Sequence, residues 1–348
     1  MGTSATLSAM RDELPRVMLR ADAGSSIGFG HFVRTSALAA YLRNDFRCVI
    51  ASFNPDGLIS DYQKNLVKDS GAEFLPLTAA DIDTADAIFL NAIEKSDIVV
   101  LDNYYFSTSY QHSVREKAHA LVCIDDVHDR HFVADAVMTF CPLSRSDFSL
   151  EPYTRFYGGM EWSFLREPFL QPRIARKANE IKKQPRVVMA IGGADPYRLT
   201  DRMIGLVTGV IPDVNLDVIA GPTVETCTPE SDKLHIWRRM DANGMASIFD
   251  KADWGIFPAS TVCVEAFSRG LPVAAGFYVD NQKEIYSYGV REGWFAPLGY
   301  LLDSPEQIAL RLENAMESPA LNKSPDFDFL ARKKDIVEVF KSLQTEET

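Results

Sequence analysis

The chain has 348 residues, of which 46% are hydrophobic, so it is long enough for about two domains with substantial cores. Its 36 basic and 48 acidic residues give a formal net charge of -12 without any basic block, which argues against a nucleic-acid-binding surface. No apolar run approaches the ~20 residues of a membrane-spanning helix, and residues 1–14 lack the apolar core of a signal peptide. We therefore expect no membrane insertion and a cytoplasmic location.

The five cysteines are scattered and form no Cys-x-x-Cys pair. Cys48, Cys123 and Cys263 lie in apolar runs, which predicts small core residues. This usage fits a reducing compartment.

The stretch from Arg20 to Arg34 organises the first half of the chain. It follows an apolar strand predicted at 17–19 and opens a predicted helix, whose apolar residues recur with helical spacing. Gly28 and Gly30 are expected to turn with positive φ and to let the backbone approach a ligand, while a helix N-terminus suits an anion. His31 follows the second glycine. The local pattern leaves two interpretations open, a reactive histidine or a surface histidine after a tight turn.

Strand and helix patterns then alternate. Strands are predicted at 47–53, 97–101 and 120–124, and helices at 56–70, 84–96 and 107–118. Short apolar strands separated by helices indicate a parallel sheet covered on both faces, which binds ligands beyond the carboxyl ends of its strands. The polar residues that follow strand ends, on the same edge as His31, are Asp22, Asp102, Tyr104, Asp125 and Asp126.

The alternation breaks between Cys141 and Gln184, where prolines predict the crossing between domains. A second cycle follows. Its strands are predicted at 186–191, 216–220, 234–238, 254–257 and 272–275, and its helices at 199–210, 243–251 with Asn243 as N-cap, 262–268, from 281, 305–317 and 330–343. The predicted fold class is α/β, with two doubly wound, Rossmann-like domains facing across a cleft. The predicted boundaries are 16–167, 184–304 and, for the C-terminal helices, 305–348.

Two loops of the second cycle carry candidate chemistry. Gly192-Gly193 follows a strand and either presents backbone N–H groups to a phosphate or forms a plain tight turn. Ser260 or Thr261 is expected to cap the next helix. Glu265 lies too far along that helix for a capping box, so its carboxylate is available to accept both hydroxyls of a ribose. The alternative is that Glu265 is a solvent-exposed acid on the helix surface, but its apolar sequence neighbours argue against this.

The segment 125–135 is rich in acidic residues and histidine. Its spacing matches neither a zinc site nor an EF-hand, so a polar loop with locally satisfied histidines is favoured over a metal site. We expect neither a metal nor a cofactor.

Taken together, these stretches resemble the UDP-2,4-diacetamido-2,4,6-trideoxy-β-L-altropyranose hydrolases of pseudaminic acid biosynthesis. The resemblance covers roughly residues 17–290. It lies in R-A-D-A-G-S-S-I-G-F-G-H-F-V-R from Arg20, D-N-Y at 102–104, I-D-D at 124–126, F-L-R-E-P-F at 164–169, G-G-A-D at 192–195, A-S-T-V-C-V-E-A at 259–266 and N-Q at 281–282. It implies a GT-B-like build and the removal of UDP from a UDP-sugar by inverting attack at the anomeric carbon, without a metal.

The resemblance also implies residue roles. His31 would activate water. Substrate-binding residues would be Asp22, Gly28, Gly30, Arg34, Tyr104, Asn281 and Gln282. Nucleotide-binding residues, on the second domain, would be Gly192, Gly193, Ser260, Thr261 and Glu265. The chain departs from the family where Pro258-Ala259 replaces the paired glycines that many members carry, and the tail after Leu301 has no match. A C-terminal helix often crosses back to the first domain in GT-B proteins, and the helix predicted at 330–343 could do so.

The expected partners are a UDP-sugar substrate and the UDP product, and the oligomeric state is open. The alternative to a hydrolase is an inverting GT-B glycosyltransferase, which passes the sugar to an acceptor. A third hypothesis is a non-catalytic nucleotide-sugar-binding protein, which has no need for His31.

Overall fold

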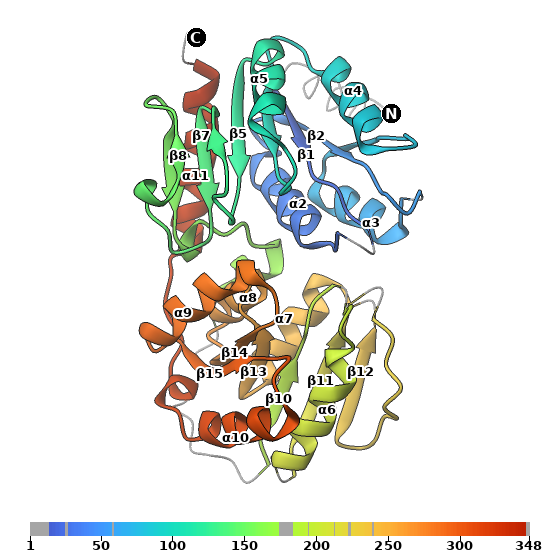
Figure 1. Ribbon diagram of the computed structural model, residues 1–348, viewed down its shortest axis with the longest axis vertical. Helices are drawn as coiled ribbons and strands as arrows, with labels where there is room; N and C mark the ends of the chain where they lie inside the picture. The colour runs from blue at the N-terminus through green and yellow to red at the C-terminus, as the bar shows by residue number, and fades with distance from the viewer. Residues whose placement is uncertain are drawn as a thin grey trace, which may run out of the picture. The chain divides into compact units, whose positions relative to one another are not determined.

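The computed structural model describes residues 14–24, 27–57, 59–173, 184–193, 195–211, 213–221, 224–238 and 240–345. It divides into two compact units (Figure 1). Unit 1 is Met1–Arg166 together with Phe329–Thr348, and unit 2 is Glu167–Asp328. Each unit is built on one parallel sheet, as the alternation of strands and helices predicts.

The sheet of unit 1 has the order β3-β2-β1-β4-β5-β7-β9. Its strands are β1 (Arg16–Arg20), β2 (Arg47–Ser52), β3 (Glu73–Pro76), β4 (Ile98–Leu101), β5 (Ala120–Ile124), β7 (Ala136–Thr139) and β9 (Arg155–Gly158). The chain runs outward from β1 to β3 and starts again at β4 on the other side of β1. The switch point, where open α/β sheets bind ligands, therefore lies between β1 and β4.

Helices cover both faces of this sheet. They are α2 (Gly30–Leu42), α3 (Asp61–Ser70), α4 (Ile82–Ala92), α5 (Thr108–Lys117) and α11 (Phe329–Thr345). Phe89 of α4 and Val114 of α5 pack with Met18 and Val99 in the core on one face. Alternate strand residues point to the opposite face, where α2 contacts β1 and β2 and α11 contacts β4. A separate two-stranded sheet pairs β6 (His131–Phe132) with β8 (Ser149–Leu150).

The sheet of unit 2 has the order β12-β11-β10-β13-β14-β15. Its strands are β10 (Arg186–Met189), β11 (Asn215–Ala220), β12 (Leu234–Arg238), β13 (Trp254–Pro258), β14 (Val273–Phe277) and β15 (Phe295–Tyr300). By the same reasoning, the switch point of this sheet lies between β10 and β13.

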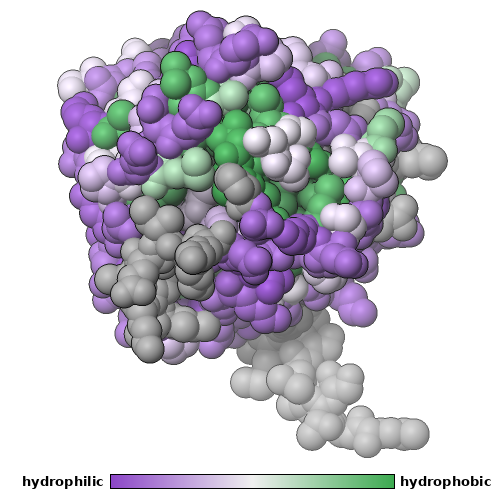
Figure 2. All heavy atoms as spheres, turned by 90° about the horizontal axis from the view of Figure 1, so that it is seen from below, coloured by the Kyte–Doolittle hydropathy of each residue, from purple (hydrophilic) through white to green (hydrophobic). Residues whose placement is uncertain are grey.

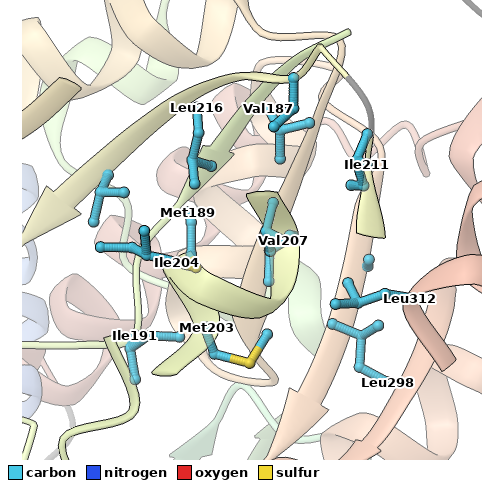
Figure 3. Packing of buried hydrophobic residues seen from close by; sticks show 14 of the residues in the cluster. Val187, Met189, Ile191, Met203, Ile204, Val207, Ile211, Leu216, Leu298 and Leu312 are labelled. Carbon is cyan, nitrogen blue, oxygen red and sulfur yellow. The ribbon is translucent and has the colours of Figure 1, made fainter. Parts of the chain in front are cut away.

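The helices of unit 2 are α6 (Leu199–Val210), α7 (Ala242–Lys251), α8 (Thr261–Ser268), α9 (Lys283–Arg291) and α10 (Pro305–Met316). Figure 3 shows side chains of α6 and α10, such as Val207 and Leu312, beside strand residues such as Val187 and Leu298 in one buried cluster. Short 3-10 helices are η1 (Arg145–Asp147), η2 (Met160–Trp162), η3 (Glu167–Leu170), η4 (Asp280–Gln282) and η5 (Pro319–Asn322).

Some predicted elements need correction. The stretch between Cys141 and Gln184 contains β9, which extends the sheet of unit 1, and the division between the units falls within that stretch, after Arg166. Asp241, not Asn243, caps α7, because its side chain accepts the Gly244 N–H at 2.7 Å. Of the two C-terminal helices, α10 packs on α6 and β15 in unit 2, whereas α11 belongs to unit 1, in agreement with a helix at 330–343 that crosses back to the first domain.

Burial of Cys48, Cys123 and Cys263 confirms that these thiols are core residues. In the view of Figure 2 hydrophilic residues cover most of the surface, and hydrophobic residues gather near the centre of that face. Within the described residues, none of the helices combines the length and apolar character needed to cross a membrane.

Candidate functional site

The loop after β1 leads into an N-terminus of α2 that carries no side-chain cap. Phe29 occupies the N-cap position, and no acidic residue lies in the first turn. Gly28 has φ +83°, a conformation that suits glycine, and it pairs with Gly24 across the loop through two backbone hydrogen bonds. Gly30 does not have the predicted positive φ, because it is already the first helical residue. It is exposed, and a Cβ there would meet nothing within 4 Å.

His31, on the first turn of α2, contacts a carboxylate at the end of β4. Its Nδ1 lies 2.7 Å from Asp102 Oδ1, and both side chains are buried. The two residues are 71 positions apart in the chain and meet because β1 and β4 are neighbours at the switch point. Asp102 also accepts the Thr35 hydroxyl at 2.8 Å. The structure therefore places a histidine and an orienting carboxylate where an α/β sheet binds ligands.

The charge of Asp102 decides which ring nitrogen of His31 carries the proton. Burial alone would raise the pKa of the Asp102 carboxyl, but the Arg34 guanidinium and the His31 imidazole hold that pKa at about 2. At neutral pH the carboxylate only accepts hydrogen bonds, so a hydrogen bond at the 2.7 Å contact puts the proton on Nδ1 of His31, a nitrogen that Arg34 Nη2 also approaches at 3.0 Å. In the neutral ring Nε2 then holds the lone pair. A base oriented by a third group in this way is the arrangement used for activating a nucleophile.

Arg34 is held by carboxylates, which leaves little of it for a substrate. Its Nε donates to Asp102 Oδ2 at 2.8 Å, its Nη2 to Asp102 Oδ1 at 2.6 Å, and its Nη1 to Asp126 Oδ2 at 3.2 Å. The guanidinium also lies over the Phe140 ring and is buried. The ion pairs raise the pKa of Arg34 although burial opposes them. Arg34 thus supports the His31–Asp102 pair, and the geometry lends no support to the predicted substrate contact.

Asp22 is also engaged within the protein. Its Oδ1 accepts Arg20 Nε at 2.8 Å and the Phe53 N–H at 2.7 Å, while its Oδ2 accepts Arg20 Nη2 at 2.9 Å and the Tyr105 hydroxyl. The Asp22 N–H donates to Asn103 Oδ1 at 2.7 Å. These hydrogen bonds tie Asp22 to the ends of three strands. Because Asp22 is also fully buried, the geometry lends no support to the predicted substrate contact.

The two tyrosines after Asn103 take different positions. The Tyr104 ring lies edge-on to the His31 ring, with centroids 4.4 Å apart. Tyr105 bonds Asp22 instead. Sequence reasoning placed Asp102 on the correct edge but assigned it no role. The strand-end position was the only signal, because the contact depends on strand order.

In unit 2 the predicted nucleotide loops follow the two strands at the switch point. Gly192 and Gly193 come after β10, and Ser260 comes after β13. Gly192 is exposed with φ +146°. The loop packs closely on Gly221 at the end of β11, where a Cβ would lie 2.5 Å from the carbonyl oxygens of Gly192 and Gly193. Ala194 lies outside the described residues.

Ser260 occupies the N-cap position of α8, but its hydroxyl makes no capping bond and donates instead to the Pro258 carbonyl at 3.4 Å. Thr261 is the first helical residue and does not cap the helix. The N-terminus of α8, like that of α2, therefore has no side-chain cap. An uncapped helix N-terminus offers N–H groups and a partial positive charge to an anion such as a phosphate.

The remaining predicted residues of unit 2 lie on α8 and on η4. Glu265 lies one turn into α8 and is buried, so it is not the solvated acid of the alternative reading. Gln282 is buried and accepts the Tyr278 N–H at 2.9 Å, whereas Asn281 is half-buried beside it. The helix predicted to open at 281 begins as η4 and continues as α9.

The acidic segment 125–135 is tied to protein partners. Asp125 accepts the N–H groups of Val127 and His128, Asp135 pairs with Arg115, and His131 contacts Ser149 and Glu151. Among the described residues, no group of three His, Cys, Asp or Glu side chains could hold a metal ion. The segment is not simply the predicted polar loop, because His131 and Phe132 form strand β6 within it.

Comparison with solved structures supports the fold. A spinosyn forosaminyltransferase, SpnP, is similar with TM-score 0.59 and 15% identity, over 95% of this chain and 99% of that chain. A putative UDP-N-acetylglucosamine 2-epimerase from Listeria monocytogenes has TM-score 0.57 and 11% identity, over 96% and 98%. S. aureus MnaA, solved with UDP, has TM-score 0.59 and 10% identity, over 96% and 99%. The chain thus has the α/β fold of GT-B glycosyltransferases, as predicted.

Sequence comparison does not identify a family for the chain. The chain is 23% identical over 290 residues to an uncharacterised protein of Methanocaldococcus jannaschii. The match covers 78% of this chain and 57% of the relative, so the chain spans little more than half of that protein's length. No family model matches the chain.

Proposed function

We propose that this protein is an enzyme that hydrolyses a UDP-linked 2,4-diacetamido-2,4,6-trideoxy sugar to UDP and the free sugar. The observation that carries the proposal is the 2.7 Å contact between His31 Nδ1 and Asp102 Oδ1, which leaves Nε2 as the basic nitrogen. Two structural neighbours support the wider class, since one is a putative UDP-N-acetylglucosamine 2-epimerase and the other was solved with UDP.

In the proposed reaction, a water oxygen attacks the anomeric carbon on the face opposite UDP. The water proton moves to His31 Nε2, while the bond from the anomeric carbon to the UDP oxygen breaks and its electron pair leaves with UDP. Asp102 keeps the ring oriented and stabilises the imidazolium that forms. Unit 2 is proposed to hold UDP through the Gly192-Gly193 loop, the N-terminus of α8 and Glu265, because N–H groups can stabilise a leaving pyrophosphate.

The test is a proton NMR time course with a panel of UDP-sugars and no acceptor. We expect UDP and free sugar of inverted anomeric configuration. We predict that His31→Asn, which can orient water but accepts no proton, reduces turnover by roughly 10²–10⁴-fold, the usual contribution of a general base. His112→Asn, the same change at an exposed histidine of α5, should leave turnover unchanged.

Each rival predicts a different result. UDP release only after an acceptor is added would identify a glycosyltransferase, as the neighbouring spinosyn forosaminyltransferase is named. Binding of a UDP-sugar without turnover would identify a binding protein. Wild-type turnover in His31→Asn would remove His31 as the base.

A further inference from the structure

One oxygen beside the His31–Asp102 pair is left unexplained by the contacts described so far. Asp126 follows β5, and its side chain is 4% exposed. Its Oδ2 accepts Arg34 Nη1 at 3.2 Å. Its Oδ1 is shielded from solvent, and no described residue donates a hydrogen bond to it. Because buried polar atoms in folded proteins are almost always paired, an unpaired carboxylate oxygen indicates a missing donor.

The surrounding loop does not supply that donor. The N–H groups of Val127 and His128 donate to Asp125 Oδ1 at 2.8 and 2.6 Å. The Cys141 thiol faces the backbone carbonyl of Asp126 at 3.9 Å, not its side chain. A donor from outside the described contacts is therefore the simplest partner for Oδ1.

Asp126 is linked to His31 through one side chain. Arg34 places Nη2 3.0 Å from His31 Nδ1 and Nη1 3.2 Å from Asp126 Oδ2. A ligand group that reached Asp126 would thus lie near the imidazole.

The charge of this group indicates which ligand chemistry it accepts. One guanidinium and the carboxylates of Asp102 and Asp126 leave a net charge of about -1 while the imidazole is neutral. Such a group repels a phosphate and attracts a neutral donor. A carboxylate only accepts hydrogen bonds, so the matching ligand group is an N–H or an O–H.

We propose that Asp126 is a specificity-determining residue of the His31 site, whose Oδ1 accepts a hydrogen bond from an amide N–H or a hydroxyl of the sugar. This inference rests on the proposed function for the identity of the ligand. It assigns to Asp126 the choice among sugars, and to His31 and Asp102 the activation of water.

The experiment compares three substrates: the full UDP-sugar, an analogue in which each acetamido N–H is replaced by an ester oxygen, and an analogue that lacks the ring hydroxyl. The wild type should prefer the full substrate over the analogue that lacks the matching donor by about 10–100-fold in kcat/KM, as expected for a hydrogen bond to a charged group. That analogue identifies the donor. In Asp126→Asn and Asp126→Ala the preference should fall to about threefold or less.

Asp125→Asn is the matched control, because the side-chain hydrogen bonds described for Asp125 come from backbone N–H groups of its own loop. It should keep the wild-type preference. A purely structural role of Asp126 would lower kcat equally for all three substrates, and an unchanged preference in both Asp126 variants would overturn the inference. Asp126→Asn keeps the side-chain volume and an acceptor for Arg34, and thermal unfolding of both variants reports whether they fold.

Failure of the proposed function would look different. If the wild type released UDP from none of the substrates, the same comparison would be made by saturation-transfer NMR with the free sugars. A donor preference in wild-type binding that disappears in Asp126→Asn would support the inference without hydrolysis. Binding with no such preference, or no binding of any sugar, would overturn it.

Discussion

Asp102 joins three side chains of one helix, α2, to the end of β4. Its two oxygens accept hydrogen bonds from His31, Arg34 and Thr35. All four side chains are buried, so the carboxylate charge is compensated mainly by one guanidinium. Breaking such a buried pair is costly, because it leaves an uncompensated charge in the interior.

This arrangement predicts how stability depends on pH. The folded-state pKa of Asp102 is about 2, against ~3.9 for an unfolded aspartate, so folding favours the charged form. The contribution of the Asp102 charge to the free energy of unfolding is on the order of 2 kcal/mol. It is fully present above about pH 4 and is lost as the pH falls through about 2. We predict that the difference in unfolding free energy between wild type and Asp102→Asn shrinks by about that amount between pH 5 and pH 2, measured by urea denaturation.

Ser36→Ala provides the control, because Ser36 lies on the same helix and its uncharged hydroxyl donates to the Phe32 carbonyl at 2.8 Å. Its effect on unfolding free energy should not vary with pH. A difference between wild type and Asp102→Asn that stays constant from pH 5 to pH 2 would contradict the argument.

At the scale of residues, sequence reasoning located His31 and the edge on which Asp102 lies, but not the contact between them. It also assigned Arg34 and Asp22 to the substrate, whereas both are buried among protein partners. A local pattern shows which residues follow a strand. It does not show which strands are neighbours, and Arg34 became a supporting residue only because β4 and β5 bring Asp102 and Asp126 to it.

At the scale of elements, most strands of the two main sheets were predicted, but β3, β7, β9 and β15 were missed. β5 and β12, the latter at an edge of its sheet, have the predicted bounds, and β1, β4 and β10 differ from them by one or two residues. β7 is buried but only four residues long. β3 and β9, at the two edges of their sheet, are largely half-exposed and were missed. β15 was missed because Pro297 and Gly299 interrupt it, and Gly299 has φ +69°. Edge strands lack the continuous apolar run that marks a strand buried on both faces.

The close packing of Gly221 predicts that adding a single methyl group there, as in Gly221→Ala, weakens nucleotide binding. In Gly221→Ala the new Cβ would lie 2.5 Å from two carbonyl oxygens of the Gly192-Gly193 loop, so that loop must shift. We predict a loss of about 1–3 kcal/mol in unfolding free energy, typical of overpacking, together with weaker UDP binding by calorimetry.

Gly205→Ala is the matched control for this change. Gly205 is exposed on α6, and a Cβ there meets nothing within 4 Å, so alanine should stabilise the helix by up to about 1 kcal/mol and leave UDP binding unchanged. If Gly221→Ala bound UDP as tightly as the wild type, the loop after β10 would not belong to the nucleotide site.

At the scale of the whole molecule, the chain leaves unit 1 after Arg166 and returns to it at Phe329. The returning helix α11 is anchored at several points: Phe340 packs edge-on against Phe46, Arg155 bonds Ser342, and Arg332 lies over the Trp162 ring. Unit 1 is therefore complete only when the last helix of the chain has docked.

Phe340 tests this dependence. Its side chain is fully buried on α11, so Phe340→Ala should lower the unfolding free energy by about 3–5 kcal/mol, as is usual when a large core cavity is created.

Trp162 is the one tryptophan in unit 1, whereas Trp237, Trp254 and Trp294 belong to unit 2. In a variant that keeps only Trp162, the fluorescence transition in urea should move to lower concentration when Phe340→Ala is added. In a Trp162→Phe variant, which keeps the three tryptophans of unit 2, adding Phe340→Ala should move the fluorescence transition little. Leu330 is 51% exposed on the same helix, so Leu330→Ala should change the unfolding free energy of either unit by no more than about 0.5 kcal/mol. If Phe340→Ala moved the transition of unit 2 and left that of Trp162 in place, α11 would not be part of the folded core of unit 1.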